Sequence, residues 1–197
     1  NIPLGSGLGG ASSDAACLLE MLTKIFNLKV SKDELVRLSL QIGKDVPYFL
    51  YRGLCIVEET GEKIAKISSY PWKRSPLWFV LVYPNKILLT KDVYEMYDRI
   101  GCKEIEINKK KILDFIKQRD LKGLLYNSLE IPAFKILPML KKIKNLMFEF
   151  GAKNVSMTGS GSTIFSVFFE KCEAVEFKNK LEKTMKNYSI FLAKSIG

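Results

Sequence analysis

Four glycines within six positions are the feature of this sequence best suited to chemistry. They belong to the run Pro3-Leu4-Gly5-Ser6-Gly7-Leu8-Gly9-Gly10-Ala11-Ser12-Ser13. Glycines let successive backbone N–H groups approach an anion, and the apolar spacing that follows predicts a helix whose N-terminus adds unpaired donors. The run therefore predicts a phosphate-binding turn. Ser12 and Ser13 would cap the helix or reach a phosphate or its Mg²⁺, and no other side chain is a predicted metal ligand.

Two better-known phosphate motifs do not explain this run. Gly5-x-Gly7-x-x-Gly10 matches the dinucleotide-binding fingerprint in form, but no apolar strand precedes it. The acidic residue expected about 20 positions further on is also absent, the nearest candidates being Glu20 and Asp33. A Walker loop ends in Gly-Lys-Ser/Thr, and the run contains no Lys. The remaining alternative is a glycine-rich turn that serves only tight packing.

Composition narrows the chemistry further. The 197 residues are 47% apolar, enough for one or two compact domains, and the longest apolar stretch is strand-sized rather than membrane-sized. Because the chain has no His, a general base must be Asp, Glu, Lys, Tyr or Cys, and a carboxylate is the first candidate. The net charge of +10 suits an enzyme of polyphosphates. It also allows nucleic-acid binding, although the lysines are dispersed and only 109–111 form a triple.

The cysteines indicate the redox compartment of the protein, and the first residue bears on whether a segment precedes it. Cys17, Cys55, Cys102 and Cys172 are widely spaced, with no Cys-x-x-Cys pair. This pattern predicts reduced, mostly buried thiols in a cytoplasmic protein rather than a zinc site. The sequence begins with Asn and opens directly on the glycine-rich run, so we expect a preceding segment that supplies a strand.

The apolar patterning predicts an α+β chain. Helices are expected at 13–26, 31–43, 93–97, 112–116, 139–150 and 172–187, and strands at 53–58, 63–67, 77–83, 155–158, 163–169 and 189–193. Ser31 and Glu34 form a capping box at the start of the second helix, and Gly151 ends the long helix before it. The strand at 77–83 completes a first α+β region, so we expect domains at 1–84 and 85–197.

With these elements in place, the motifs resemble a known superfamily. The pattern Pro-x-x-x-Gly-Leu-Gly-Gly-x-Ser-Ser-Asp-Ala-Ala at 3–16 is similar to the phosphate loop of the galactokinase, homoserine kinase, mevalonate kinase and phosphomevalonate kinase (GHMP) superfamily. Ile42-Gly43-Lys44-Asp45-Val46-Pro47-Tyr48-Phe49 resembles a signature of the 4-diphosphocytidyl-2-C-methyl-D-erythritol kinase family. Three further motifs follow in that family's order: Thr60-Gly61-Glu62, Asn127-Ser128-Leu129-Glu130 and Met157-Thr158-Gly159-Ser160-Gly161-Ser162-Thr163.

The resemblance implies a fold and a reaction. The fold would be a ribosomal-protein-S5-like domain, incomplete at its N-terminus, followed by a ferredoxin-like domain. The reaction would transfer the γ-phosphoryl group of ATP, with Mg²⁺, to the 2-hydroxyl of the cytidine-diphosphate-linked methylerythritol. Asp45 matches the family's catalytic aspartate, which accepts the hydroxyl proton. The residues agree with this role, because Asp45 lies just past a helix end and before Pro47, where a rigid turn can aim it.

The resemblance also implies an acceptor pocket. Thr90 and Tyr94 match substrate-pocket positions, with the Tyr94 ring against the cytosine, and Gly159, Ser160 and Gly161 line the same cleft. From the pattern alone, Tyr94 could equally belong to the core.

The sequence departs from the family at Lys44, Glu59 and Ser128, where Ala, Gly and Asp are usual, which leaves the exact substrate open. Another GHMP small-molecule kinase and a non-catalytic nucleic-acid-binding protein are the alternatives. Since the family's catalytic Lys would precede Asn1, residues 1–197 alone are expected to be inactive.

Overall fold

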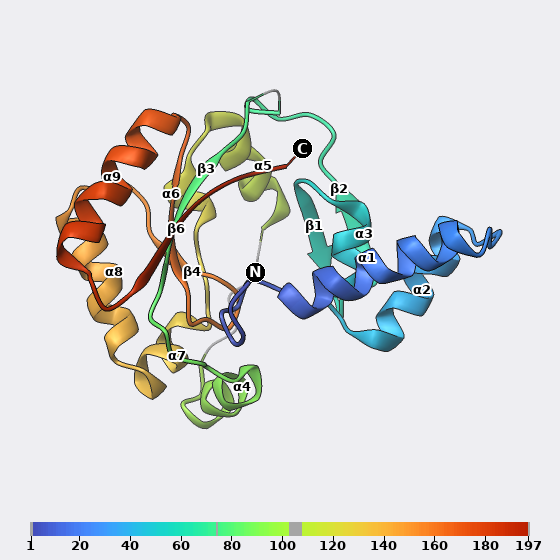
Figure 1. The fold of residues 1–197 in the computed structure, drawn as a ribbon, viewed down its shortest axis with the longest axis horizontal. Coiled ribbons are helices and arrows are strands. Elements are labelled where there is room, and N and C mark those ends of the chain that lie inside the picture. Colours follow the sequence, from blue (N-terminus) through green and yellow to red (C-terminus); the bar gives the residue numbers. More distant parts are fainter. Residues whose placement is uncertain (1, 74, 103–107, 197) are drawn as a thin grey trace. The chain divides into compact units, whose positions relative to one another are not determined.

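The computed structural model describes residues 2–73, 75–102 and 108–196 (Figure 1). The chain divides into two compact units, each described here by itself. Unit 1 comprises Asn1–Leu8 with Tyr70–Ser195, and unit 2 comprises Gly9–Ser69 with Ile196–Gly197. The predicted glycine-rich run therefore passes from unit 1 into unit 2 between Leu8 and Gly9.

Unit 2 consists of three helices and a β-hairpin. Its helices are α1 (Gly10–Ile25), α2 (Lys32–Ile42) and α3 (Val46–Tyr51), and its strands are β1 (Cys55–Glu58) and β2 (Lys63–Lys66). The strands pair antiparallel around a turn in which Gly61 has a φ of 106°. The capping box is half present, since the Ser31 hydroxyl accepts a hydrogen bond from Glu34 N at 3.2 Å. Helix α1 packs on α3 through Ala16, Val46 and Leu50.

Unit 1 is built on a four-stranded antiparallel sheet. Its strands are β3 (Trp78–Tyr83), β4 (Ser156–Met157), β5 (Ile164–Phe168) and β6 (Ser189–Lys194), in the order β4-β5-β3-β6. All three strand pairs are antiparallel. The helices of this unit are α4 (Thr90–Arg99), α5 (Lys109–Gln118), α6 (Leu121–Leu124), α7 (Glu130–Ile136), α8 (Met139–Glu149) and α9 (Lys171–Thr184).

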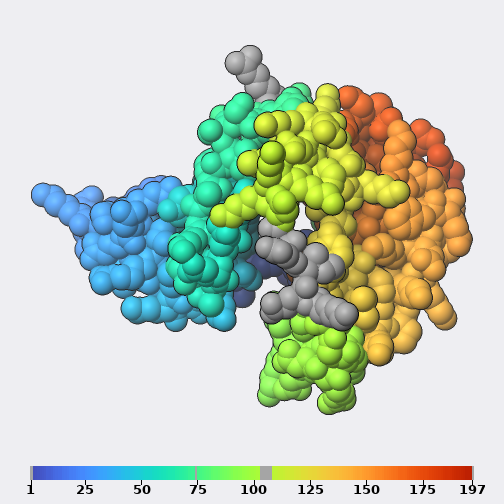
Figure 2. Space-filling model, turned by 180° about the vertical axis from the view of Figure 1, so that it is seen from behind, coloured from blue at the N-terminus to red at the C-terminus, as the bar shows by residue number. Residues whose placement is uncertain are grey.

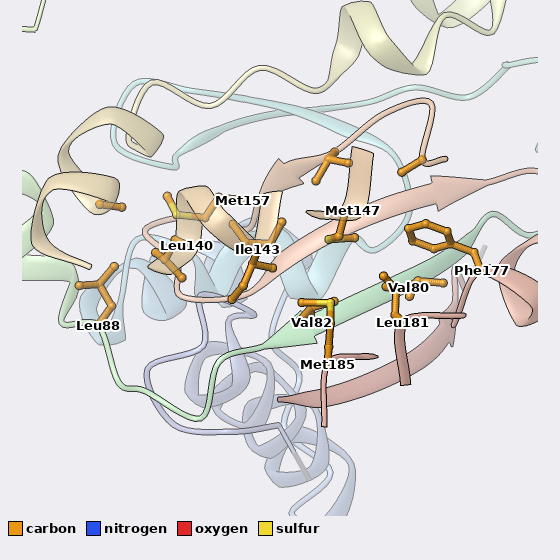
Figure 3. Close-up of a cluster of buried hydrophobic side chains, with 14 of the residues drawn as sticks. Val80, Val82, Leu88, Leu140, Ile143, Met147, Met157, Phe177, Leu181 and Met185 are labelled. Atoms are coloured by element: carbon orange, nitrogen blue, oxygen red, sulfur yellow. The ribbon is translucent and has the colours of Figure 1, made fainter. Parts of the chain in front are cut away.

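The core of unit 1 lies between β3 and two helices. Val80 and Val82 alternate on one face of β3 and are fully buried. Helices α8 and α9 cover this face, and Figure 3 shows their side chains gathered along the strand. Those of α8 are Leu140, Ile143 and Met147, and those of α9 include Phe177 and Leu181. Each set recurs at a spacing of three or four residues, which places it on one side of its helix.

Three sequence-based expectations need correction. The strand predicted at 77–83 forms, but it pairs with β5 and β6 rather than completing the first region. Asp45 does not lie in a turn alone, because a helix, α3, begins at the next residue, and a proline is tolerated in a first helical turn. The thiols are free but not buried: Cys17 and Cys172 are exposed and the other two are intermediate. The predicted boundary between 84 and 85 stays a prediction, and the compact units divide the chain elsewhere.

No helix in the described ranges combines the length and the apolar character that crossing a membrane requires.

Candidate functional site

The first part of the glycine-rich run, in unit 1, is held by its carbonyl groups. The carbonyl oxygens of Leu4, Gly5 and Ser6 all accept hydrogen bonds from other segments of the unit. The donors are Tyr83 OH to Leu4 at 3.2 Å, Ser162 N and Leu88 N to Gly5 at 3.3 and 3.4 Å, and Thr158 Oγ1 and Thr163 N to Ser6 at 2.9 and 3.2 Å. Most of these bonds come from the small-residue turn 158–163, which therefore fixes the path of the run.

Close packing explains one glycine of this part. Gly7 has a φ of +73°, and a Cβ built on it would lie 2.3 Å from Thr158 O and 2.6 Å from Gly161 O. No side chain fits such a gap, and only glycine adopts this backbone conformation without cost. The turn 158–161 and the glycine-rich run therefore approach each other closely within unit 1.

The second part of the run forms the start of α1 in unit 2. Gly9 is the N-cap residue with a φ of 66°, and a Cβ on it would lie 2.7 Å from Cζ of Phe49. The helix has no side-chain cap, so of the two alternatives expected for Ser12 and Ser13, capping is wrong and contact with a phosphate or its Mg²⁺ stays a prediction. Instead, the Ser13 hydroxyl donates to Gly10 O at 2.8 Å, one turn back along the chain. Both hydroxyls keep oxygen lone pairs that can face a ligand.

The N–H groups of the run contrast with its carbonyls. From Gly5 to Ser12, no backbone N–H donates a hydrogen bond to an acceptor in the described part of the chain. The last four of these residues open a helix of 16 residues, whose N-terminus carries about half a positive charge. Backbone donors without acceptors, together with a helix N-terminus, are an arrangement that binds anions.

Asp45 is placed in unit 2 by the packing around it. It is the N-cap residue of α3, its side chain makes no capping hydrogen bond, and the residue is exposed. The next two residues, Val46 and Pro47, are buried and anchor the helix start. The hairpin turn lies against the preceding residue, since a Cβ on Gly61 would be 2.2 Å from Lys44 O. The backbone around Asp45 is thus held on both sides while its carboxylate stays open to a ligand.

Two predicted acceptor-pocket residues meet in unit 1. Thr90 Oγ1 lies 2.9 Å from Ser160 Oγ, within hydrogen-bond distance. Tyr94 follows one turn later on α4, which stands out at the margin of the unit in the space-filling view (Figure 2). Its side chain is 53% exposed, so the alternative interpretation of Tyr94 as a core residue is wrong.

Burial shifts two groups in unit 2. It raises the pKa of the Tyr48 hydroxyl, which donates to Gly53 O at 3.2 Å, and the neighbouring Cys55 adds to the shift. Burial also raises the pKa of the Cys55 thiol, opposed by the weaker attraction of Lys66 and Lys32. Neither group belongs to the predicted site.

A surface pocket of about 430 Å³ in unit 1 contains none of the predicted site residues. Phe177 and Val167 line it, with cations at its rim. Two of these cations have partners: the Arg119 guanidinium lies 4.2 Å from the Phe169 ring centroid, and Lys180 pairs with Glu176 at 2.7 Å.

Sequence reasoning quoted the segment Asn127 to Glu130 but gave it no role. In the structure its side chains hold the strand and turn that carry Ser160. The only indication in the sequence was that Asn127 comes just before a helix, and an Asn at that place is typical of any helix start.

Two family models match the chain. "GHMP kinases N terminal domain" matches residues 1–53, and "GHMP kinases C terminal" matches residues 110–187. Among curated proteins, 4-diphosphocytidyl-2-C-methyl-D-erythritol kinase of Syntrophus aciditrophicus is 35% identical over 196 residues, which cover 100% of this chain and 68% of that protein. The protein of the same name from Ligilactobacillus salivarius is 35% identical over 92% of this chain and 62% of its own length. This chain thus spans about two thirds of the length of these relatives.

Solved structures agree with these matches. A crystal structure of 4-(cytidine 5'-diphospho)-2C-methyl-D-erythritol kinase superposes with a TM-score of 0.80 at 30% identity, over 100% of this chain and 69% of that one. Homoserine kinase from Cytophaga hutchinsonii superposes with a TM-score of 0.73 at 17% identity, over 100% of this chain and 67% of that one. The second likeness concerns the fold alone.

Proposed function

This chain belongs to the GHMP kinase family, and we propose that it transfers the γ-phosphoryl group of ATP to the 2-hydroxyl of 4-diphosphocytidyl-2-C-methyl-D-erythritol. The family and the names of its relatives support a phosphotransferase of non-mevalonate isoprenoid synthesis. The observation that carries the proposal is the run of backbone N–H groups from Gly5 to Ser12, which have no acceptor in the described part of the chain and lead into a helix N-terminus.

In this proposal the phosphates of ATP bind to residues Pro3 to Ser13. The N–H groups would donate to phosphate oxygens, while the carbonyls of Gly5 and Ser6, already bonded to the turn 158–163, keep the loop in shape. Phosphoryl transfer needs positioning and electrostatic stabilisation more than covalent chemistry, and backbone donors to the phosphates would contribute to both.

Asp45 is the proposed general base. It would take the proton of the 2-hydroxyl as that oxygen attacks the γ-phosphorus, and the bond to the β-phosphate oxygen breaks to release ADP. Its support is its place in the matched signature and its exposed carboxylate at the start of α3. The buried Val46 and Pro47 fix the backbone that aims it.

The proposed acceptor pocket includes Thr90, Tyr94, Gly159, Ser160 and Gly161. The 2.9 Å contact between Thr90 and Ser160 supports it, because it brings α4 and the turn 158–163 together within one unit. The exposed Tyr94 ring offers a face on which a cytosine can stack.

The residues present fit Mg²⁺ carried by the nucleotide rather than held in a protein cage. No group of three or more His, Cys, Asp or Glu in the described ranges could hold a metal ion. Mg²⁺ bound to nucleotide phosphates needs only one or two protein oxygens, and Ser12 or Ser13 could supply one. When bound, the ion neutralises charge on the phosphates; the protein's own part is to hold the phosphates with its N–H groups.

We also infer a finer description of the fold and setting. The order β4-β5-β3-β6, with α8 and α9 as crossovers, supports a ferredoxin-like arrangement in unit 1. Unit 2, which carries most of the residues that the N-terminal family model matches, would be the remainder of an S5-like domain. The free state of all four cysteines is consistent with a cytoplasmic protein.

A substrate panel tests the function. The full-length gene product would be assayed for ADP release with the cytidyl substrate, mevalonate, homoserine and a sugar, and phosphorus NMR would locate the new phosphate. We expect turnover with the cytidyl substrate and a phosphate on its 2-hydroxyl. Turnover with another acceptor alone would show that the reaction class is right and the substrate wrong. Salt-sensitive RNA binding without turnover would favour the nucleic-acid alternative.

A further inference from the structure

Asn127 and Glu130 hold the outer edge of β4. This strand is at the edge of the sheet, so the backbone groups that Met157 turns away from β5 have no neighbouring strand. The Asn127 amide donates to Met157 O at 2.8 Å, and Glu130 Oε1 accepts from Met157 N at 3.0 Å. Two side chains therefore make the hydrogen bonds to the backbone of Met157 that a fifth strand would otherwise make. We call them the 127–130 clamp.

The Asn127 amide also reaches into the turn beyond β4. Its Nδ2 donates a second hydrogen bond, to Gly159 O at 2.8 Å, and its Oδ1 accepts from Leu129 N at 2.9 Å. The orientation of the amide is fixed by this network, because exchanging oxygen and nitrogen would set an oxygen against two carbonyl oxygens. Asn127 thus grips the backbone on both sides of Thr158.

Glu130 is itself held in place by a charge partner. Lys144 Nζ lies 2.6 and 2.8 Å from its two carboxylate oxygens, and Ser156 Oγ donates to it at 3.3 Å. The side chains of Glu130 and Lys144 are only 15% and 21% exposed. A mostly buried carboxylate with three partners has little freedom to move, so it is a firm support for the end of β4.

We propose that Asn127 is a positioning residue for the acceptor substrate, acting through the Gly159 carbonyl to keep Ser160 beside Thr90. This rests on the proposed function, which places Ser160 and Thr90 in the acceptor pocket. The next residue after Gly159 is Ser160, whose side chain makes its hydrogen bond to Thr90. The clamp and the pair it supports all lie within unit 1.

The hydrogen-bond pattern predicts whether loss of the 127–130 clamp weakens the binding of the acceptor or of ATP more. Unit 1 donates several hydrogen bonds to the carbonyls of Leu4, Gly5 and Ser6. Only the bond from Thr158 Oγ1 to Ser6 O comes from the stretch 157–159 that Asn127 holds, and Ser6 O keeps a second bond, from Thr163 N. Ser160 depends on its contact with Thr90 and on the backbone that Asn127 holds. Loss of the clamp should therefore weaken the acceptor more than ATP.

The test compares two asparagines of the same unit. Asn127→Asp keeps the shape and the bond from Leu129 N, but it turns two donated hydrogen bonds into contacts between oxygens. Asn154→Asp is the matched control, because Asn154 makes a similar two-way pair with the backbone of Val167, donating to its O at 2.9 Å and accepting from its N at 2.8 Å. Asn127→Ser, which shortens the side chain, serves if the aspartate variant does not fold.

In the full-length gene product, we expect Asn127→Asp to raise the KM for the acceptor about tenfold and the KM for ATP by less than about twofold. Asn154→Asp should lower thermal stability comparably and leave both KM values within about twofold. Equal KM values for the two variants would overturn the proposal and leave Asn127 with a structural role only.

A second measurement does not depend on activity. Hydrogen–deuterium exchange of peptides covering 157–163 should be faster in Asn127→Asp than in the parent and unchanged in Asn154→Asp. Unchanged exchange in Asn127→Asp would refute the clamp whatever the substrate is. If the parent protein phosphorylates no acceptor while the exchange result holds, the proposed function fails and the clamp on the turn stands.

Discussion

Replacing Gly9 and Gly10 separately should distinguish a glycine that packing requires from one that the proposed phosphate site requires. Gly10 is the first residue of α1, so Gly10→Ala adds a Cβ to helical backbone and should leave the free energy of unfolding unchanged or raise it by up to about 1 kcal/mol. Gly9 has a φ of +66°, and its new Cβ would lie 2.7 Å from the Phe49 ring. Gly9→Ala should therefore cost roughly 1 kcal/mol for the backbone and about 1 to 3 kcal/mol for the overlap.

Both substitutions should lower the affinity for nucleotide by about tenfold or more, since each places a methyl group beside the N–H groups proposed to bind phosphate. Calorimetry with a non-hydrolysable ATP analogue measures the affinity, and urea unfolding measures the stability. Gly101→Ala is the control for backbone strain alone: its φ is +61° and no described atom lies within 4 Å of the new Cβ. It should cost about 1 kcal/mol and leave nucleotide affinity unchanged.

The outcome for Gly10→Ala is decisive, because its stability and its affinity should move independently. If this variant binds the analogue as tightly as the parent, the start of α1 does not approach the phosphates. If its affinity falls only in proportion to a loss of stability, the effect comes from a disturbed fold rather than from the ligand.

Three further predictions use other residues. Asp45→Asn should lower kcat by about 100-fold or more and change the dissociation constant of the ATP analogue by only a few-fold, measured by steady-state kinetics and calorimetry; near-normal turnover would place the base elsewhere. Lys144→Met leaves the mostly buried Glu130 without its cation and should cost about 2 kcal/mol in urea unfolding, whereas an unchanged midpoint would show that the pair adds nothing. Because burial raises the pKa of Cys55, its alkylation by iodoacetamide should lag behind that of the exposed Cys17 as pH rises. Above about pH 8.5 the thiol ionises more readily in the unfolded chain than in the folded one, so the free energy of unfolding should fall, an effect absent in Cys55→Ser.

Local patterning predicted most elements of this fold but not how they assemble. The helices α1, α2, α8 and α9 and the six strands of the described ranges lie close to their expected positions, because apolar spacing, a serine cap and a terminal glycine are properties of neighbouring residues. Helix α3 was missed since Pro47 suggested a rigid turn, while a proline at the second helical position costs no hydrogen bond. The prediction that β3 completes the first region was wrong, because the strands with which it pairs begin some eighty residues further on and its own sequence does not indicate them.

The candidate site likewise has a part that the sequence could predict and a part that it could not. The glycine-rich run could be found from composition, because a backbone anion site needs little beyond glycines and a following helix. The predicted roles of Asp45, Thr90 and Tyr94 came from the resemblance and stay predictions, although the structure brings Thr90 and Ser160 together. The side chains of Asn127 and Glu130 could not be assigned from the sequence, because their partners at 156–159 are about thirty residues away.

The structure also shows that the two interpretations of the glycine-rich run apply at different positions. A Cβ would lie 2.5 Å from Ile87 at Gly5, 2.3 Å from Thr158 O at Gly7 and 2.7 Å from Phe49 at Gly9, so these three glycines are required by packing inside their own units. That packing, with the bonds to the carbonyls of Gly5 and Ser6, turns the acceptors of the loop toward the protein. Backbone donors and acceptors point in different directions, so the N–H groups are left for a ligand. Tight packing and the proposed binding of phosphate are therefore compatible in this loop, and Gly10, at the helix start, is the position where ligand approach itself can be tested.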